Sequence, residues 1–175
     1  MVSKVDNSLA AGTWYVTNGF NPDYDCFACQ LLSFEFNKPG ETSPIFYNAL
    51  YNLIAVNGTL IWNDIIMRGS ETSPGILTLN GRDSGFSNVQ HWYIMHLSDD
   101  TMLVYYCGDL MTWHFEGVLV MSKTPTLNQT KVPELTIALN SLELGWDDLC
   151  ELKPSEECAN APSPFQPYQA KFLNN

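Results

Sequence analysis

The chain carries little positive charge. Its 175 residues include 8 Lys and Arg against 19 Asp and Glu, a formal net charge of −11, and only 3 His. Such a surface repels phosphate groups, which argues against nucleic acid or anionic lipid as a partner. No apolar run approaches the ~20 residues that a membrane-spanning helix needs, which predicts a soluble protein without a transmembrane segment. Residues 1–11 are too polar for a signal peptide, so we expect removed targeting segments or a longer precursor.

Short segments of strand character alternate with turn signals along most of the chain. With 45% hydrophobic and 13% aromatic residues, the composition is that of one folded domain with a full core. The pattern predicts eight strands, at 13–17, 31–37, 45–56, 59–67, 74–79, 89–97, 101–107 and 115–123. The turns between them are predicted at Lys38-Pro39-Gly40, Asn57-Gly58, Asn80-Gly81 and Ser98-Asp99-Asp100.

This strand count favours an all-β fold, an eight-stranded antiparallel up-and-down barrel with room for one small ligand, with an open sandwich as the alternative. Pro133-Glu134 starts a helix whose apolar residues, Leu135, Ala138, Leu139 and Leu142, recur at helical spacing. We expect that face to pack on the barrel wall. The predicted organisation is a lead-in at 1–11, the barrel and helix at 12–152, and an extended Pro-rich tail at 153–175, held by a disulfide or a partner.

The cysteines lie mainly near the two ends of the chain. Cys26 and Cys29 are close to the N-terminus, Cys150 and Cys158 are close to the C-terminus, and Cys107 lies between them. This layout favours disulfides that tie the tail to the first loop, and therefore an oxidising compartment. Zinc at Cys26-x-x-Cys29 is the alternative; it lacks a second close pair of ligands and a nearby histidine, so we predict no metal.

The stretch from Gly12 to Gln30 carries a family resemblance. Gly12-x-Trp14 resembles the opening motif of the lipocalins, in which Trp14 would plug one end of the barrel. Asn21-Pro22 followed by Phe27-x-Cys29-Gln30 is similar to the lipocalin domain of the violaxanthin de-epoxidases, plant and algal enzymes of the xanthophyll cycle. Further matches follow in the same order: Pro74-Gly75-Ile76-Leu77, Trp92-Tyr93-Ile94, Val104-Tyr105-Tyr106, Gly108, Trp113 and Val132-Pro133-Glu134-Leu135.

The resemblance implies a disulfide pattern, a ligand and a location in the cell. It pairs Cys29 with Cys158, which leaves Cys26 and Cys150 as a second bridge and Cys107 unpaired. Family enzymes open an epoxide of a xanthophyll, a carotenoid, in the acidic thylakoid lumen of the chloroplast, with ascorbate as the reductant. We therefore expect a carotenoid ligand in this chain, with Gln90, Trp92, Tyr106 and Trp113 as the contact residues, and a chloroplast lumenal location.

The family acid is an aspartate two residues before Trp-Tyr-Ile, with a tyrosine on the next strand. Here that position holds Gln90, followed by His91, while Tyr106 is retained and Cys107 replaces a basic residue. An amide cannot deliver the proton that epoxide opening needs. Alternation places His96 on the same inward face as Gln90 but about 20 Å along the strand, too far to substitute.

The same residues also have purely structural interpretations. The tryptophans are commonly core residues, and a buried Gln90 could be satisfied by the Tyr106 hydroxyl. Asp23 and Asp25 are predicted to stabilise a turn after Pro22. His91, His96 and His114 are predicted to be partly exposed residues of strands or loops, with a role as pH sensors as the weaker hypothesis.

Three functions follow. The favoured one is a lumenal xanthophyll-binding or structural lipocalin without catalysis, docked on a photosystem or antenna complex. The second is an active xanthophyll epoxide-converting enzyme, a de-epoxidase or isomerase, that uses Tyr106. The third is a secreted lipocalin with another apolar ligand, for which glycan at the sequons of Asn57 and Asn128 would be the sign.

Overall fold

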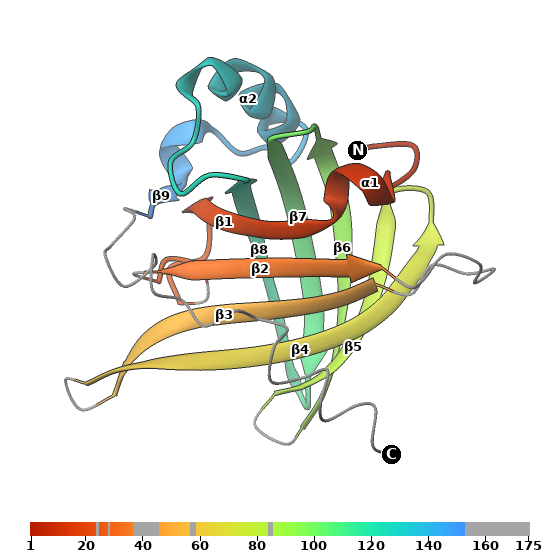
Figure 1. Ribbon diagram of the computed structural model, residues 1–175, viewed down its shortest axis with the longest axis vertical. Helices are drawn as coiled ribbons and strands as arrows, with labels where there is room; N and C mark the ends of the chain where they lie inside the picture. The colour runs from red at the N-terminus through yellow and green to blue at the C-terminus, as the bar shows by residue number, and fades with distance from the viewer. Residues whose placement is uncertain (24, 28, 37–45, 57–58, 84–85, 153–175) are drawn as a thin grey trace.

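The computed structural model describes residues 1–23, 25–27, 29–36, 46–56, 59–83 and 86–152. Over these residues the strands form a single curled antiparallel sheet, with the helical segments outside it (Figure 1). The strands are β1 (Gly12–Gly19), β2 (Gln30–Phe36), β3 (Phe46–Val56), β4 (Thr59–Ser73), β5 (Ile76–Asp83), β6 (Phe86–Leu97), β7 (Thr101–Leu110), β8 (Trp113–Ser122) and β9 (Cys150–Glu151). The helical segments are α1 (Asn7–Ala10), η1 (Gln129–Lys131), α2 (Val132–Asn140) and η2 (Trp146–Asp148).

The sheet closes through β1. Consecutive strands pair from β2 to β8, and β1 pairs with β8 on one side and with β2 on the other. Gly12 to Tyr15 lie beside β2, whereas Asn18 and Gly19 lie beside β9. The predicted all-β barrel is therefore confirmed, because an open sandwich would leave one of these edges unpaired.

One predicted turn is wrong. Asn80 and Gly81 lie inside β5, paired with Arg68 and Met67 on β4 and with Val89 and Asn88 on β6. Two ladders of hydrogen bonds outweigh the turn preference of an Asn-Gly pair. The turn over Ser98-Asp99-Asp100 is confirmed, since Ser98 N donates to Thr101 O at 2.8 Å. The turns predicted at 38–40 and 57–58 lie outside the described residues.

The N-terminal segment closes one end of the barrel. Trp14 is fully buried, and its Nε1 donates to the carbonyl oxygen of Ala10 at 2.8 Å. Glu71 Oε1 accepts from the backbone N–H groups of Val5 and Gly75, at 3.0 and 2.8 Å, which ties this segment to the β4–β5 turn. The role of Trp14 as a plug of the barrel stays a prediction. The opposite end, where β1 ends and β7 turns into β8, is called the distal end below.

Apolar side chains form one cluster inside the barrel and another outside it. The interior cluster includes Trp14, Phe34, Leu79, Trp92, Tyr106 and Met121. The outer cluster joins Leu103, Val118 and Val120 of β7 and β8 to Leu135 and Leu139 of α2. The prediction that the helix packs on the barrel wall is confirmed.

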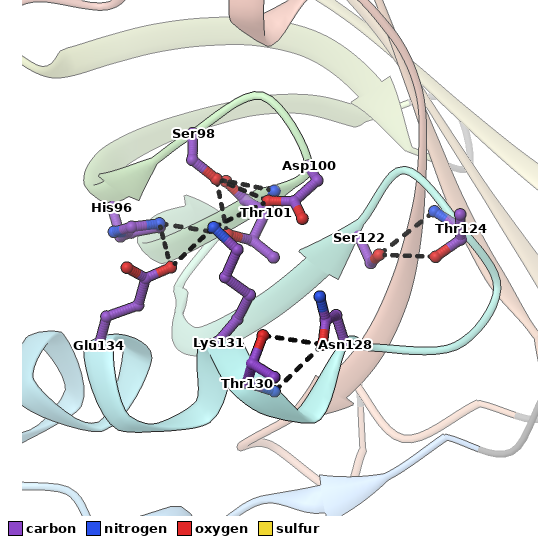
Figure 2. Close-up of polar contacts among 10 residues, drawn as sticks. All are labelled: His96, Ser98, Asp100, Thr101, Ser122, Thr124, Asn128, Thr130, Lys131 and Glu134. Atoms are coloured by element: carbon purple, nitrogen blue, oxygen red, sulfur yellow. Dashed lines mark hydrogen bonds and ion pairs between the residues drawn. The ribbon is translucent and has the colours of Figure 1, made fainter.

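Polar contacts hold the same helix at its N-terminal end (Figure 2). Lys131 Nζ lies 3.4 Å from a carboxylate oxygen of Asp100 and 3.4 Å from one of Glu134. His96 Nε2 lies 3.2 Å from Thr101 Oγ1 and 3.8 Å from Glu134 Oε1. His96 is thus outside the barrel, packed toward α2.

The inward position predicted for His96 is therefore wrong. The register between β6 and β7 shifts between Ile94 and His96, so that Ile94 pairs with Val104 and His96 with the outward Leu103. An irregularity of this kind adds one residue to one strand and reverses the face of every side chain beyond it. Burial lowers the pKa of His96, with the carboxylate of Glu134 opposing that effect.

Candidate functional site

A buried carboxylate lies against the tyrosine that the sequence singles out. The Tyr106 hydroxyl donates to Asp25 Oδ1 at 2.5 Å. Asp25 Oδ2 accepts from the backbone N–H groups of Asn21 and Val118, at 2.9 and 3.2 Å. Asp25 is 0% exposed and Tyr106 is 6% exposed. The β1–β2 loop, β7 and β8 therefore meet at one carboxylate, inside the distal half of the barrel.

Glycines make room for this pair. A Cβ added to Gly117 would overlap with the Asp25 carboxylate and the Tyr106 hydroxyl, and one added to Gly19 would overlap with the Asp25 backbone. Gly117 pairs with Tyr106 across the β7–β8 ladder. Any larger residue at position 117 would occupy the space in which the hydroxyl meets the carboxylate.

Burial raises the pKa of Asp25 from 3.8 to about 6. Loss of solvation is the largest cause, and the hydrogen bonds from Tyr106 and from the backbone of Asn21 and Val118 oppose it. The group is therefore a carboxylate at neutral pH and a neutral acid in mildly acidic solution. A buried acid with a raised pKa is a common feature of sites that transfer protons.

Aromatic rings surround the tyrosine. The ring centre of Tyr106 lies 6.0 Å from that of Trp92 and 6.2 Å from that of Phe115, and Phe34 meets Trp92 edge-on at 6.0 Å. Gln90 is buried beside them, and its Oε1 accepts from Trp92 Nε1 at 2.7 Å. The idea that Gln90 is satisfied by the Tyr106 hydroxyl is replaced by this pair of contacts, because that hydroxyl donates to Asp25.

The turn role predicted for Asp23 and Asp25 covers only part of what these residues do. Asp23 N donates to Asn21 Oδ1 at 3.0 Å and Asp25 N to Asn21 O at 2.7 Å, so a turn does form after Pro22. The prediction of a site without an acid rested on Gln90 at the family position and on the distance to His96, both on one strand, and left out the loop after Pro22. Asp25 supplies a carboxyl group from a different strand connection. The signal available in the sequence was its place next to Cys26, within the stretch that carries the family resemblance.

The other predicted contact residues are more scattered. Trp92 and Gln90 are buried next to Tyr106, whereas Trp113 is 54% exposed at the start of β8. His91 is exposed on the outer face of β6, and exposed His114 Nδ1 lies 2.9 Å from Asp109 Oδ1. Ligand contacts by Gln90, Trp92, Tyr106 and Trp113 stay predictions, and for Trp113 they would have to be made at the distal end.

A disulfide holds the loop that carries Asp25. Cys26 is bonded to Cys150, as predicted, across 124 positions of sequence. Cys29 is also disulfide-bonded, and its predicted partner Cys158 lies outside the described residues. Cys107 is the free cysteine among the described residues. The bridge to Cys150 joins β9 to the residue that follows Asp25.

Within the described ranges, no group of three or more His, Cys, Asp or Glu side chains is placed to hold a metal ion. None of the described helices combines the length and the apolar character needed to cross a membrane.

The barrel is shared with proteins of known structure. The tryptamine complex of the amine-binding protein of Rhodnius prolixus superposes with a TM-score of 0.70 at 14% identity, covering 100% of this chain and 92% of that one. Lobster apocrustacyanin A1 superposes with a TM-score of 0.64 at 16% identity, covering 89% of this chain and 83% of that one. The bovine lipocalin allergen Bos d 2 superposes with a TM-score of 0.62 at 12% identity, covering 90% of this chain and 99% of that one. The fold is that of a lipocalin.

The family follows from the sequence. The model of the VDE lipocalin domain matches residues 1–153, and the chain belongs to that family. Violaxanthin de-epoxidase, chloroplastic, of Arabidopsis thaliana is 26% identical over 172 residues, and that of Nicotiana tabacum is 25% identical over 170 residues. Each comparison covers 93% of this chain but only 36% and 34% of the relatives, so the chain spans about a third of their length.

Proposed function

We propose that the barrel binds a xanthophyll epoxide and that Asp25, through Tyr106, supplies the proton that opens the epoxide. The observation that carries the proposal is the 2.5 Å hydrogen bond between the Tyr106 hydroxyl and a buried carboxyl group whose pKa is raised to about 6. Membership of the VDE lipocalin domain family supports an apolar epoxide as the ligand. The expectation of a non-catalytic protein depended on a missing acid, and an acid is present beside Tyr106.

The proton state of Asp25 controls what the tyrosine can do. Above the pKa of Asp25, the carboxylate accepts a hydrogen bond from the Tyr106 hydroxyl, so that the hydroxyl cannot donate to a ligand. Below it, the neutral acid can donate to the tyrosine oxygen, which frees the phenolic O–H to donate to a ligand oxygen. Such a relay delivers a proton only in mildly acidic solution, which fits the acidic thylakoid lumen that we propose as the location.

Reductive opening then balances with ascorbate as the co-substrate. The C–O bonds of the protonated epoxide break, two electrons and a second proton enter, the oxygen leaves as water, and a carbon–carbon double bond forms. Ascorbate supplies the two electrons and becomes dehydroascorbate. The chain's own contribution is the first proton, which Tyr106 gives and Asp25 replaces. The aromatic rings around Tyr106 provide an apolar environment that excludes water from this transfer.

Turnover of violaxanthin with ascorbate at about pH 5 tests the proposal. Asp25→Asn keeps an acceptor for the tyrosine but cannot donate a carboxyl proton, and Tyr106→Phe removes the relay. Each is expected to lower kcat by about a hundredfold or more. Tyr105→Phe is the matched control, because Tyr105 is the neighbouring tyrosine, packs against the outer cluster and donates instead to Glu116, at 2.7 Å. No turnover by the parent protein overturns the catalytic assignment.

A second candidate is a xanthophyll-binding protein without turnover. It is favoured by the same burial: Asp25 is fully covered, Tyr106 nearly so, and the Gln90 oxygen is already engaged by Trp92. In that case violaxanthin binds, and the parent, Asp25→Asn and Tyr106→Phe all yield no product. Docking on a photosystem or antenna complex stays a prediction of the sequence, as does the alternative of secretion with another apolar ligand.

A further inference from the structure

On the inner face of β6, the side-chain oxygen of one buried residue has no hydrogen-bond partner among the described residues. Asn88 is 2% exposed, and its Oδ1 has no hydrogen-bond partner in the part of the chain that the structure describes. An unsatisfied buried amide oxygen is costly to a folded protein, by an amount comparable to a lost hydrogen bond. Such a group therefore calls for a specific explanation.

The position of Asn88 points to the barrel interior. The pairing of β6 with β7 runs without a register shift from Asn88 to Ile94, so Asn88, Gln90, Trp92 and Ile94 share one face. Trp92 and Ile94 belong to the interior cluster. Gly81 pairs with Asn88 from β5 and brings no side chain to that place. Asn88 thus lies inside the distal half, two residues beyond Gln90, about 7 Å along the strand.

We infer that Asn88 is a specificity-determining residue that accepts a hydrogen bond from a hydroxyl group of the ligand. The ligand class is an elongated apolar molecule that carries at least one hydroxyl. Its apolar body lies along the aromatic side chains near Trp92, and its hydroxyl meets Asn88 Oδ1. The inference rests on the proposed function only in taking the barrel interior as the binding site; it requires no epoxide chemistry.

Paired ligands that differ in a hydroxyl test this assignment. Binding of zeaxanthin and of β-carotene, which share a polyene length, is measured by quenching of tryptophan fluorescence, and hexadecanol and hexadecane form a second pair. The parent protein is expected to bind the hydroxylated member about tenfold more tightly. Asn88→Leu, of nearly the same shape, is expected to abolish that preference while leaving the affinity for the hydrocarbon unchanged. Val89→Ala, at the exposed neighbouring position, is the control and keeps the preference.

The other outcomes are decisive in different ways. Equal weakening of both members of a pair by Asn88→Leu, or a lower unfolding midpoint of that variant without ligand, would assign Asn88 a structural role and overturn the inference. A parent protein with no preference in either pair overturns it as well. If neither carotenoid binds but the alcohol preference is present and lost in Asn88→Leu, the inference holds and the proposed xanthophyll function fails.

Discussion

Gly117 has no side chain at the place where the Asp25 carboxylate and the Tyr106 hydroxyl meet. Gly117→Ala would put a methyl group into both of them. Because the surrounding strands cannot move apart freely, we expect the free energy of unfolding to fall by about 1–3 kcal/mol. Chemical denaturation measures this change. Gly145→Ala is the matched control, since a Cβ added there would have its nearest neighbour at 3.4 Å, in ordinary contact. An unchanged free energy of unfolding in Gly117→Ala would contradict the geometry.

The raised pKa of Asp25 predicts how stability depends on pH. The folded chain holds this proton up to about pH 6, whereas the unfolded chain loses it near 3.8. The group's contribution is therefore fully present below about pH 4 and is lost as the pH rises through 6. The unfolding free energy of the parent, minus that of Asp25→Asn, should fall by about 3 kcal/mol across this window and stay level above it. A difference that rises with pH would contradict a raised pKa.

The bond between Cys26 and Cys150 closes a long loop. Replacing both cysteines by serine should lower the free energy of unfolding by about 2–5 kcal/mol, because the unfolded chain gains freedom. The measurement is the denaturant midpoint under non-reducing conditions. Cys107→Ser is the control, since Cys107 is the free cysteine of the described residues and its loss removes no bridge.

Leu139 anchors α2 on the outer wall of the barrel. It is fully buried, so Leu139→Ala should cost about 2–5 kcal/mol of stability. Ile137, on the same helix, is 73% exposed, and Ile137→Ala should change stability by less than about 0.5 kcal/mol. Thermal or chemical unfolding of the two variants separates them. Equal effects would mean that the helix is not held by its buried face.

Alternation and turn signals were enough to predict the barrel, because each strand buries one face and must change direction at a turn. The same reasoning misjudged Asn80-Gly81, since a local turn preference says nothing about the two strands that pair with it. It also misplaced His96, because one extra residue near Met95 leaves no trace in the pattern of apolar side chains. These are effects of tertiary pairing on local signals.

The candidate site was half predictable. Tyr106, Trp92 and Gln90 sit on paired strands, so their proximity follows from strand alternation. Asp25 reaches the same place from a loop whose path depends on contacts far away in sequence, including the amide of Val118 and the bond to Cys150. Strand alternation alone therefore does not predict that Asp25 lies beside Tyr106.

The Asp25 carboxyl group is shared by three separate stretches of chain, and this sharing has an experimental consequence. A single protonation event there alters the anchoring of the β1–β2 loop and the orientation of the Tyr106 hydroxyl together. Acid profiles of ligand uptake and of turnover should accordingly share one midpoint near the folded-state pKa of Asp25, about 6, and the fall in folding stability should end at the same pH. Assigning any of them to a separate titrating group would require showing that its midpoint stays in place when Asp25 is replaced.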